Sequence, residues 1–294
     1  MPWRDALIAM LVPLTWGMGL VIAKPAVDQF PPMLLMALRF SVTALVLIWF
    51  VSIPRQHLKT LAWVALIGSA LQYGLSYNGL RLLDASTTAL IVQIETPFLL
   101  LLSVMWLGDR LNRQQVVGLI VAFVGLYILT GAPNLQGQWL GIGLTLGGAF
   151  MWALGQVILR GMTQKMPEQL SGMITIAWIA VFAAPQLLVA SLLLEDNHWQ
   201  YISQANMQVW AAVFYLGLVM TAFGYTCWYH VLGRYPASQA GPYLLLLPVF
   251  SILGGWLWLD EPVNARMLLG GGIIIAGVAL LTVSFTRVIN KAQQ

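Results

Sequence analysis

A glutamate in the middle of an apolar stretch is the residue of this sequence with the clearest potential for chemistry. Glu95 lies near the centre of the segment 85–107, which is long enough to cross a bilayer. A charged side chain at the bilayer centre costs roughly 2.5 to 3.5 kcal/mol, so it is normally paired, protonated or in contact with a wet cavity. We therefore expect a role for Glu95 in proton coupling. The alternative is a permanent ion pair with Arg39.

Arg39 is the second charge expected inside the membrane. It lies about seven residues from the outer end of the second apolar segment. Its guanidinium could pair with Glu95, bind a substrate carboxylate, or reach outward along its long stem. These alternatives stay open at the level of the sequence.

Aromatic and amide side chains recur at a spacing of four residues, which places each pair on one face of a helix. The pairs are Gln72 and Ser76, Tyr73 and Tyr77, Trp152 and Gln156, and Tyr225 and Tyr229. Polar groups inside a membrane face protein or water, so these pairs predict a central cavity or hydrogen bonds between helices. The candidate substrate-binding residues are Trp16, Arg39, Gln72, Tyr73, Tyr77, Trp152, Gln156, Tyr225 and Tyr229.

Two prolines occupy nearly equivalent places in the fourth and ninth apolar segments. Pro97 and Pro248 each remove a backbone donor and disturb the preceding helical turn. Their pairing favours a role as hinges in a conformational change over a purely local kink.

The elements that position these residues are apolar helices. The chain of 294 residues is 60% hydrophobic and 8% charged, whereas a soluble domain has about 25% charged residues. This composition predicts an all-α integral membrane protein surrounded by a lipid bilayer. The ten expected transmembrane segments are 6–23, 33–53, 61–83, 85–107, 114–131, 139–159, 170–194, 209–231, 237–259 and 267–285.

The basic residues predict the orientation. With the N-terminus inside, ten fall on the cytoplasmic side and three outside, which places both termini in the cytoplasm. The three outer ones are Lys24, Arg81 and Arg266. We expect a multi-pass protein of the cell inner membrane. No basic cluster remains to indicate a nucleic-acid partner.

An internal repeat divides the chain into two halves, 1–131 and 132–294, within one membrane domain. Trp16, Gly19 and Lys24 recur 136 residues later, and Tyr73, Tyr77, Ala85, Ser86, Gly118 and Gly125 recur 152 residues later. Because each half has five segments, the second half enters the membrane upside down. Such inverted repeats occur in secondary transporters, whose sites lie between the repeats near the midplane.

Small residues on the fifth and tenth segments predict close helix packing. The expected contact residues are Gly118, Ala122 and Gly125 on one segment, and Gly272 and Ala276 on the other.

Several short motifs resemble the EamA family of the drug/metabolite transporter superfamily. They are Trp16-Gly17, Pro31-Pro32 followed by Leu38-Arg39-Phe40, Gly108-Asp109-Arg110-Leu111 answered by Asp260-Glu261-Pro262-Val263, Gly233-Arg234-Tyr235 and Leu247-Pro248-Val249. Pro262 departs from the pattern, since it stands where Arg110 does in the first motif. The resemblance implies a central cavity with the fifth and tenth segments at the periphery. It also implies export of small metabolites, such as amino acids or their derivatives, across the membrane.

An intramembrane enzyme acting on a lipid or small substrate is the rival function. His57 and His198 fall on opposite sides and His230 at a helix end, so the histidines do not form a metal-ligand pattern. Cys227 is the only cysteine. We expect neither a metal nor a cofactor, and we predict a transporter rather than an enzyme.

Overall fold

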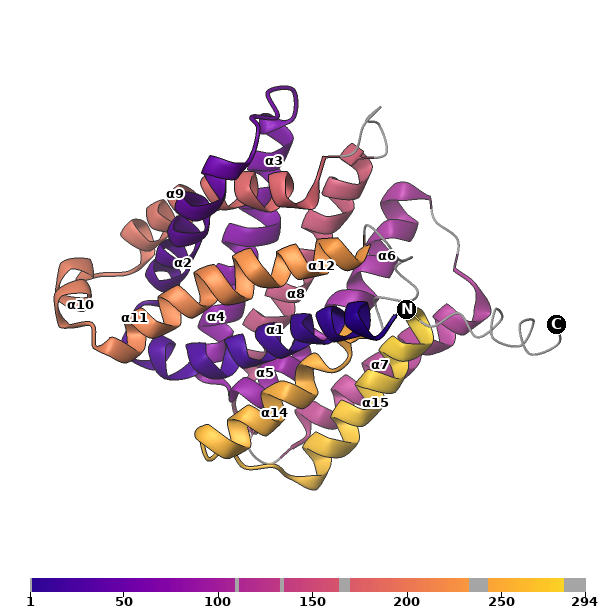
Figure 1. The fold of residues 1–294 in the computed structure, drawn as a ribbon. Coiled ribbons are helices and arrows are strands. Elements are labelled where there is room, and N and C mark those ends of the chain that lie inside the picture. Colours follow the sequence, from indigo (N-terminus) through magenta and orange to yellow (C-terminus); the bar gives the residue numbers. More distant parts are fainter. Residues whose placement is uncertain (1, 109–110, 133–134, 164–169, 233–242, 283–294) are drawn as a thin grey trace.

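The structure, a computed structural model, describes residues 2–108, 111–132, 135–163, 170–232 and 243–282. Within these ranges the regular structure is helical, and no strand occurs. The chain folds into a bundle in which the N-terminal helix α1 crosses the molecule between later helices (Figure 1). Seven helices of the described residues are long and apolar enough to cross a membrane.

The helices follow the expected segments closely. The expected segments that correspond to a single helix are those of α1 (Trp3–Gln29), α2 (Pro32–Leu47), α7 (Arg113–Thr130), α8 (Trp139–Thr163), α9 (Gly172–Leu194), α14 (Leu247–Trp258) and α15 (Ala265–Thr282). The fourth expected segment consists of α5 (Ala85–Val92) and α6 (Glu95–Leu107). Part of the ninth expected segment, 237–242, lies outside the described residues, and α14 covers residues 247–258 of the rest. A short helix, α10 (His198–Gln204), lies in the polar connection after α9, where the sequence predicted no helix.

Two segments contain π-helical turns in their middle. The third consists of α3 (Leu58–Ala65), the π-helix η2 (Leu66–Leu71) and α4 (Gln72–Leu82). The eighth consists of α11 (Met207–Phe214), the π-helix η4 (Tyr215–Phe223) and α12 (Gly224–Leu232). A π-turn changes the hydrogen-bond register and is often found at functional sites. Both π-helices lead directly into the helices that carry the predicted tyrosines.

Helices from the two ends of the chain pack against one another rather than in separate bundles. Helix α2 packs on α9, α4 packs on α8, and α1 lies against α11, η4, α12 and α14. The main core therefore combines apolar side chains from α1 and α2 with others from α9 and α11. This interleaving places the centre of the molecule between early and late parts of the sequence.

Helices α7 and α15 form a closely packed pair at one edge of the bundle (Figure 1). A Cβ atom added at Gly118 would lie 2.8 Å from the carbonyl oxygen of Gly277, and one added at Gly277 would lie 2.8 Å from Cα of Ala122. The prediction for α7 is confirmed, but that for α15 was wrong. Gly272 and Ala276 are exposed, and Gly270 and Gly277 make the contact instead. The repeat offset of 152 from Gly118 and Gly125 identifies these two glycines.

Two glutamates hold the first turns of helices distant in sequence. The Glu261 carboxylate accepts hydrogen bonds from the backbone nitrogens of Ala85 at 2.6 Å and Ser86 at 2.9 Å, and also from the Ser86 hydroxyl. The Glu195 carboxylate accepts from the backbone nitrogens of Met33 at 2.8 Å and Leu34 at 3.0 Å. The first backbone donors of a helix have no partner within it, and the helix dipole favours a negative charge there. These carboxylates therefore fix the starts of α5 and α2.

Candidate functional site

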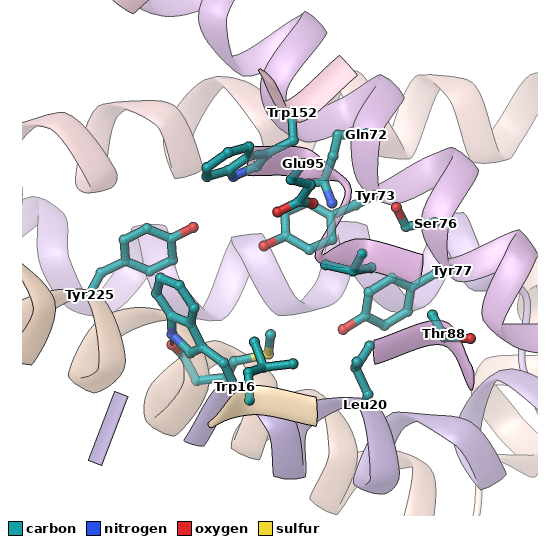
Figure 2. A pocket seen from close by; sticks show the side chains of 13 residues that line it. Trp16, Leu20, Gln72, Tyr73, Ser76, Tyr77, Thr88, Glu95, Trp152 and Tyr225 are labelled. Atoms are coloured by element: carbon teal, nitrogen blue, oxygen red, sulfur yellow. Dashed lines mark hydrogen bonds between the residues drawn. The ribbon is translucent and has the colours of Figure 1, made fainter. Parts of the chain in front are cut away.

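A cavity lies at the centre of the bundle, where six of the expected segments meet (Figure 2). The cavity is narrow, with a volume of about 80 Å³. The lining side chains come from α1, α4, α5, α6, α8, η4, α12 and α14. They are Trp16, Leu20, Gln72, Tyr73, Ser76, Tyr77, Thr88, Val92, Glu95, Trp152, Met220, Tyr225 and Leu247.

Glu95 faces this cavity from a break between two helices. Helix α5 ends at Val92, a turn follows at Gln93 and Ile94, and α6 begins at Glu95. The described residues form ion pairs between Lys24 and Asp28 and between Asp5 and His230, and no ion pair within them includes Glu95. Glu95 is thus a carboxyl group in the cavity wall without a cationic side-chain partner in that part of the chain.

A second break, in the late part of the chain, contacts the first. Residues 245–246 form a turn before α14, which begins at Leu247 and carries Pro248. Because Pro248 has no backbone N–H, the Leu244 carbonyl lacks its usual helical donor, and it accepts a hydrogen bond of 3.4 Å from the Gln93 side chain. The Gln93 side chain at the first break therefore donates to a backbone carbonyl that has lost its helical donor at the second break.

Pro97 lies in the first turn of α6 and is buried. The Gln93 carbonyl, four residues earlier, accepts a bond of 3.3 Å from the Thr96 backbone nitrogen. The prolines thus mark the first turns that follow the two breaks, as their positions within the segments predicted. Whether they act as hinges stays a prediction.

Arg39 lies behind the cavity wall and does not line the cavity. Its side chain is fully buried, and its Nε donates to the Thr221 hydroxyl at 2.9 Å. Its terminal nitrogens donate to the hydroxyls of Tyr73 at 3.3 Å and Tyr77 at 3.4 Å. The guanidinium carbon also lies 4.4 Å from the centre of the Tyr73 ring, a cation–π contact. It reaches neither Glu95 nor the surface.

Helix α4 supplies the polar wall of the cavity. Gln72, Tyr73, Ser76 and Tyr77 share one side of the helix because of their spacing, and all four line the cavity. The Gln72 side-chain oxygen and the Ser76 hydroxyl are buried without a hydrogen-bond partner. Buried polar atoms normally have partners, so these two atoms are suited to bind a polar solute.

Trp16 and Tyr225 supply much of the aromatic wall. Their ring centres lie 4.9 Å apart, and the Trp16 indole nitrogen donates to the Met220 carbonyl at 3.1 Å in the π-helix η4. This bond leaves the face of the indole as an apolar surface fixed in orientation. Trp152 of α8 adds a third ring to the cavity (Figure 2).

The structure brings together most of the predicted binding residues. Trp16, Gln72, Tyr73, Tyr77, Trp152 and Tyr225 line the cavity with Glu95. Gln156 is partly buried on α8 but does not line it. The side chain of Tyr229 lies outside those that the structure describes.

Several lining residues were missed by the sequence reading. Thr88 and Val92 precede Glu95 by seven and three residues, so helical spacing counted back from Glu95 would have found them. Leu247 is the repeat counterpart of Glu95. Met220 gives no comparable signal, because it lies within the π-helix η4, which shifts the register of the helix before Tyr225.

Known proteins match this chain over nearly its whole length. The chain is 31% identical over 288 residues to a probable amino-acid metabolite efflux pump of Salmonella typhimurium, covering 96% of both chains. It is 30% identical over 281 residues to a protein of the same name in Escherichia coli, covering 94% of this chain and 93% of that one. A probable terminal-alkyne amino-acid exporter of Streptantibioticus cattleyicolor is 24% identical, covering 92% of this chain and 91% of that one.

A solved crystal structure shares the fold. It superposes with a TM-score of 0.65 at 20% identity and covers 96% of this chain and 98% of that one. The model of the EamA-like transporter family matches residues 3–131 and 139–283. These matches and the apolar helices identify a multi-pass membrane transporter rather than an enzyme, and the chain belongs to the EamA-like transporter family.

Proposed function

We propose that this protein exports small metabolites, such as amino acids or their derivatives, across the cell inner membrane in exchange for protons. The observation that carries this proposal is Glu95, which faces a cavity of polar and aromatic side chains and has no ion-pair partner among the described residues. A carboxyl group in this setting can bind and release a proton as access to the cavity changes. The names of the relatives support the substrate class.

The proposed architecture is ten transmembrane segments in two inverted halves, 1–131 and 132–294. The family match supports it, since it covers one stretch of each half. The helix contacts also support it: α4 packs on α8 as α12 packs on α1, and α6 packs on α8 as α14 packs on α1. The turn at 93–94 precedes that at 245–246 by 152 residues.

Helix caps repeat at the same offset. The Asn112 side chain accepts a bond from the Gln115 backbone nitrogen at 2.8 Å at the start of α7. The Asn264 side chain accepts from the Met267 backbone nitrogen at 2.9 Å at the start of α15. These caps, 152 residues apart, support a duplicated helical unit.

Both termini are proposed to lie in the cytoplasm, as the distribution of basic residues predicts. Single cysteines test this in a Cys227→Ala background, because Arg113 and Val263 are exposed near loops expected on opposite sides. A membrane-impermeant thiol reagent added to intact cells should label Val263→Cys and not Arg113→Cys. Labelling of both positions from the same side would contradict the inverted repeat.

The proposed substrate-contacting residues are those of the cavity wall. Tyr73, Tyr77, Gln72 and Ser76 present hydrogen-bonding groups, whereas Trp16, Trp152 and Tyr225 present aromatic surface. This combination fits a solute with a polar end and an apolar end, as many amino acids have. Bending at the turns before Pro97 and Pro248 would change access to the cavity while Glu95 gains or loses its proton.

Transport by the purified protein in lipid vesicles tests the proposed function. Vesicles with an acidic interior should accumulate radiolabelled amino acids from a panel, with saturable kinetics, because outward proton movement drives inward solute movement. Vesicles without protein and vesicles without a pH gradient are the controls. Failure to move any solute of the panel above the protein-free control would reject this substrate class. Equal accumulation with and without the gradient would reject proton exchange.

A further inference from the structure

Arg39 has an unusual set of partners for a buried cation. Among the described residues, all of its hydrogen bonds go to neutral acceptors: the hydroxyls of Tyr73, Tyr77 and Thr221, and the sulfur of Met36. Neither ion pair within the described residues includes it. Its positive charge therefore lies directly behind the tyrosines of the cavity wall without a compensating carboxylate in that part of the chain.

The bonds from Arg39 decide where the tyrosine protons point. A guanidinium has five donors and no acceptor, so each tyrosine oxygen accepts from Arg39 and must direct its own proton elsewhere. Within the described residues, neither hydroxyl donates to a protein acceptor, and both side chains line the cavity. The two protons are thus available on the cavity side.

We propose that the hydroxyls of Tyr73 and Tyr77 form a receptor for the carboxylate of the transported solute, with Arg39 as the residue that positions and polarises them. This inference rests on the proposed function and specifies which part of the substrate is recognised. Hydrogen bonds to a charged group are roughly twice as strong as neutral ones. A positive charge just behind the donors strengthens them further in surroundings of low dielectric constant.

The arrangement explains why Arg39 does not itself enter the cavity. A direct Arg–carboxylate pair binds in a fork with two parallel bonds and would hold a transported solute tightly. Two hydroxyls between the charge and the solute retain the preference for an anion and allow faster release. The position of the rings supports this geometry, since the ring centres of Tyr73 and Tyr77 lie 5.7 Å apart with their planes tilted by 60°.

A purely structural role for Arg39 makes a different prediction. Arg39 ties α2 to α4 through the tyrosines and to η4 through Thr221. If this tie were its whole function, loss of the tyrosine hydroxyls would lower stability and weaken every ligand equally. It would not change the preference for a charged ligand over a neutral one.

Binding of an amino acid and its carboxamide by the purified protein separates these roles. The carboxamide keeps the side chain and the ammonium group and lacks the negative charge. Tryptophan fluorescence reports binding, because Trp16 and Trp152 line the cavity. The natural protein should bind the carboxylate about tenfold more tightly than the carboxamide, as expected for one strengthened hydrogen bond to a charged group.

Tyr73→Phe combined with Tyr77→Phe keeps both rings and removes both hydroxyls. This variant should lose the preference for the carboxylate while its affinity for the carboxamide changes less than about threefold. Tyr215→Phe is the matched control, since the Tyr215 hydroxyl bonds to the Thr15 carbonyl at 3.3 Å and does not line the cavity. It should keep the full preference.

Arg39→Gln should lose the preference as well, and Arg39→Lys should restore part of it by keeping the charge. Should the Arg39 variants fail to fold, the tyrosine variants decide. An unchanged preference in the double phenylalanine variant, or no preference in the natural protein, would overturn the inference. A clear carboxylate preference in a protein that transports no amino acid would instead reject the proposed function and leave the receptor supported.

Discussion

Glu95 and Glu261 are two carboxylates inside the same bundle with opposite surroundings. Glu261 is buried and accepts three hydrogen bonds from the first turn of α5, two from backbone nitrogens and one from the Ser86 hydroxyl. Glu95 starts α6 and faces the cavity, with no ion-pair partner among the described residues. The bonded carboxylate fixes the start of a helix, and the carboxyl group without an ion-pair partner is the one that we propose to exchange protons. The partners of an acidic group, rather than its depth alone, separate structure from function.

Removal of the Glu261 carboxylate should cause the largest loss of stability. Glu261→Ala leaves the Ala85 and Ser86 backbone nitrogens without an acceptor, at a cost of about 3 kcal/mol in the free energy of unfolding. The melting temperature in detergent should fall by roughly 5 to 10 °C. Glu95→Gln should leave it unchanged or raised, because Glu95 makes no ion pair that the amide would break. An equal fall in the melting temperature of both variants would contradict the difference that we infer between Glu261 and Glu95.

Gly255→Ala tests the same cap without removing the carboxylate. The new Cβ would clash with the Glu261 carboxylate and the Ser86 hydroxyl, since both groups lie against the backbone of Gly255 where the Cβ would be placed. Overpacking of this kind costs about 1 to 3 kcal/mol, again measured by thermal unfolding. Gly272→Ala is the control, because a Cβ there meets no neighbour. Equal stability of the two variants would show that the cap is loosely packed.

Glu195→Gln should have the smallest effect. Glu195 caps α2 as Glu261 caps α5, and it also accepts from the Ser191 hydroxyl at 2.6 Å. It is only partly buried, so water can replace the lost bonds, and we expect a loss of about 1 kcal/mol. A loss larger than that in Glu261→Gln would show that burial does not set the strength of these caps.

The sequence predicted the parts of this fold that depend on pattern. Apolar segments of about 20 residues located the helices, and the repeat offsets paired Trp16 with Trp152 and Tyr73 with Tyr225, all of which meet in one cavity. The position of Glu95 inside an apolar segment was sufficient to identify it as a candidate site residue, and it lines the cavity. These features are local or periodic, so a single sequence records them.

Other features depend on contacts that no local pattern records. The role of Glu261 rests on a helix start 176 residues away, and Glu261 itself follows an ordinary span end. The place of Arg39 behind Tyr73 and Tyr77 depends on how α2 meets α4. The π-turns that set the register of Met220 also left no pattern that we could read.

Proton movement in vesicles that contain the Glu95→Gln variant tests the central claim most directly. In vesicles that contain the natural protein, a pH-sensitive dye in the lumen should report proton efflux when a transported solute is added outside. Vesicles with Glu261→Gln should show the same efflux per folded molecule. Glu95→Gln keeps the shape of the side chain and removes its titration. We predict that it moves no protons, while exchange of labelled for unlabelled solute continues. Proton efflux at the natural ratio to solute in Glu95→Gln would contradict the account.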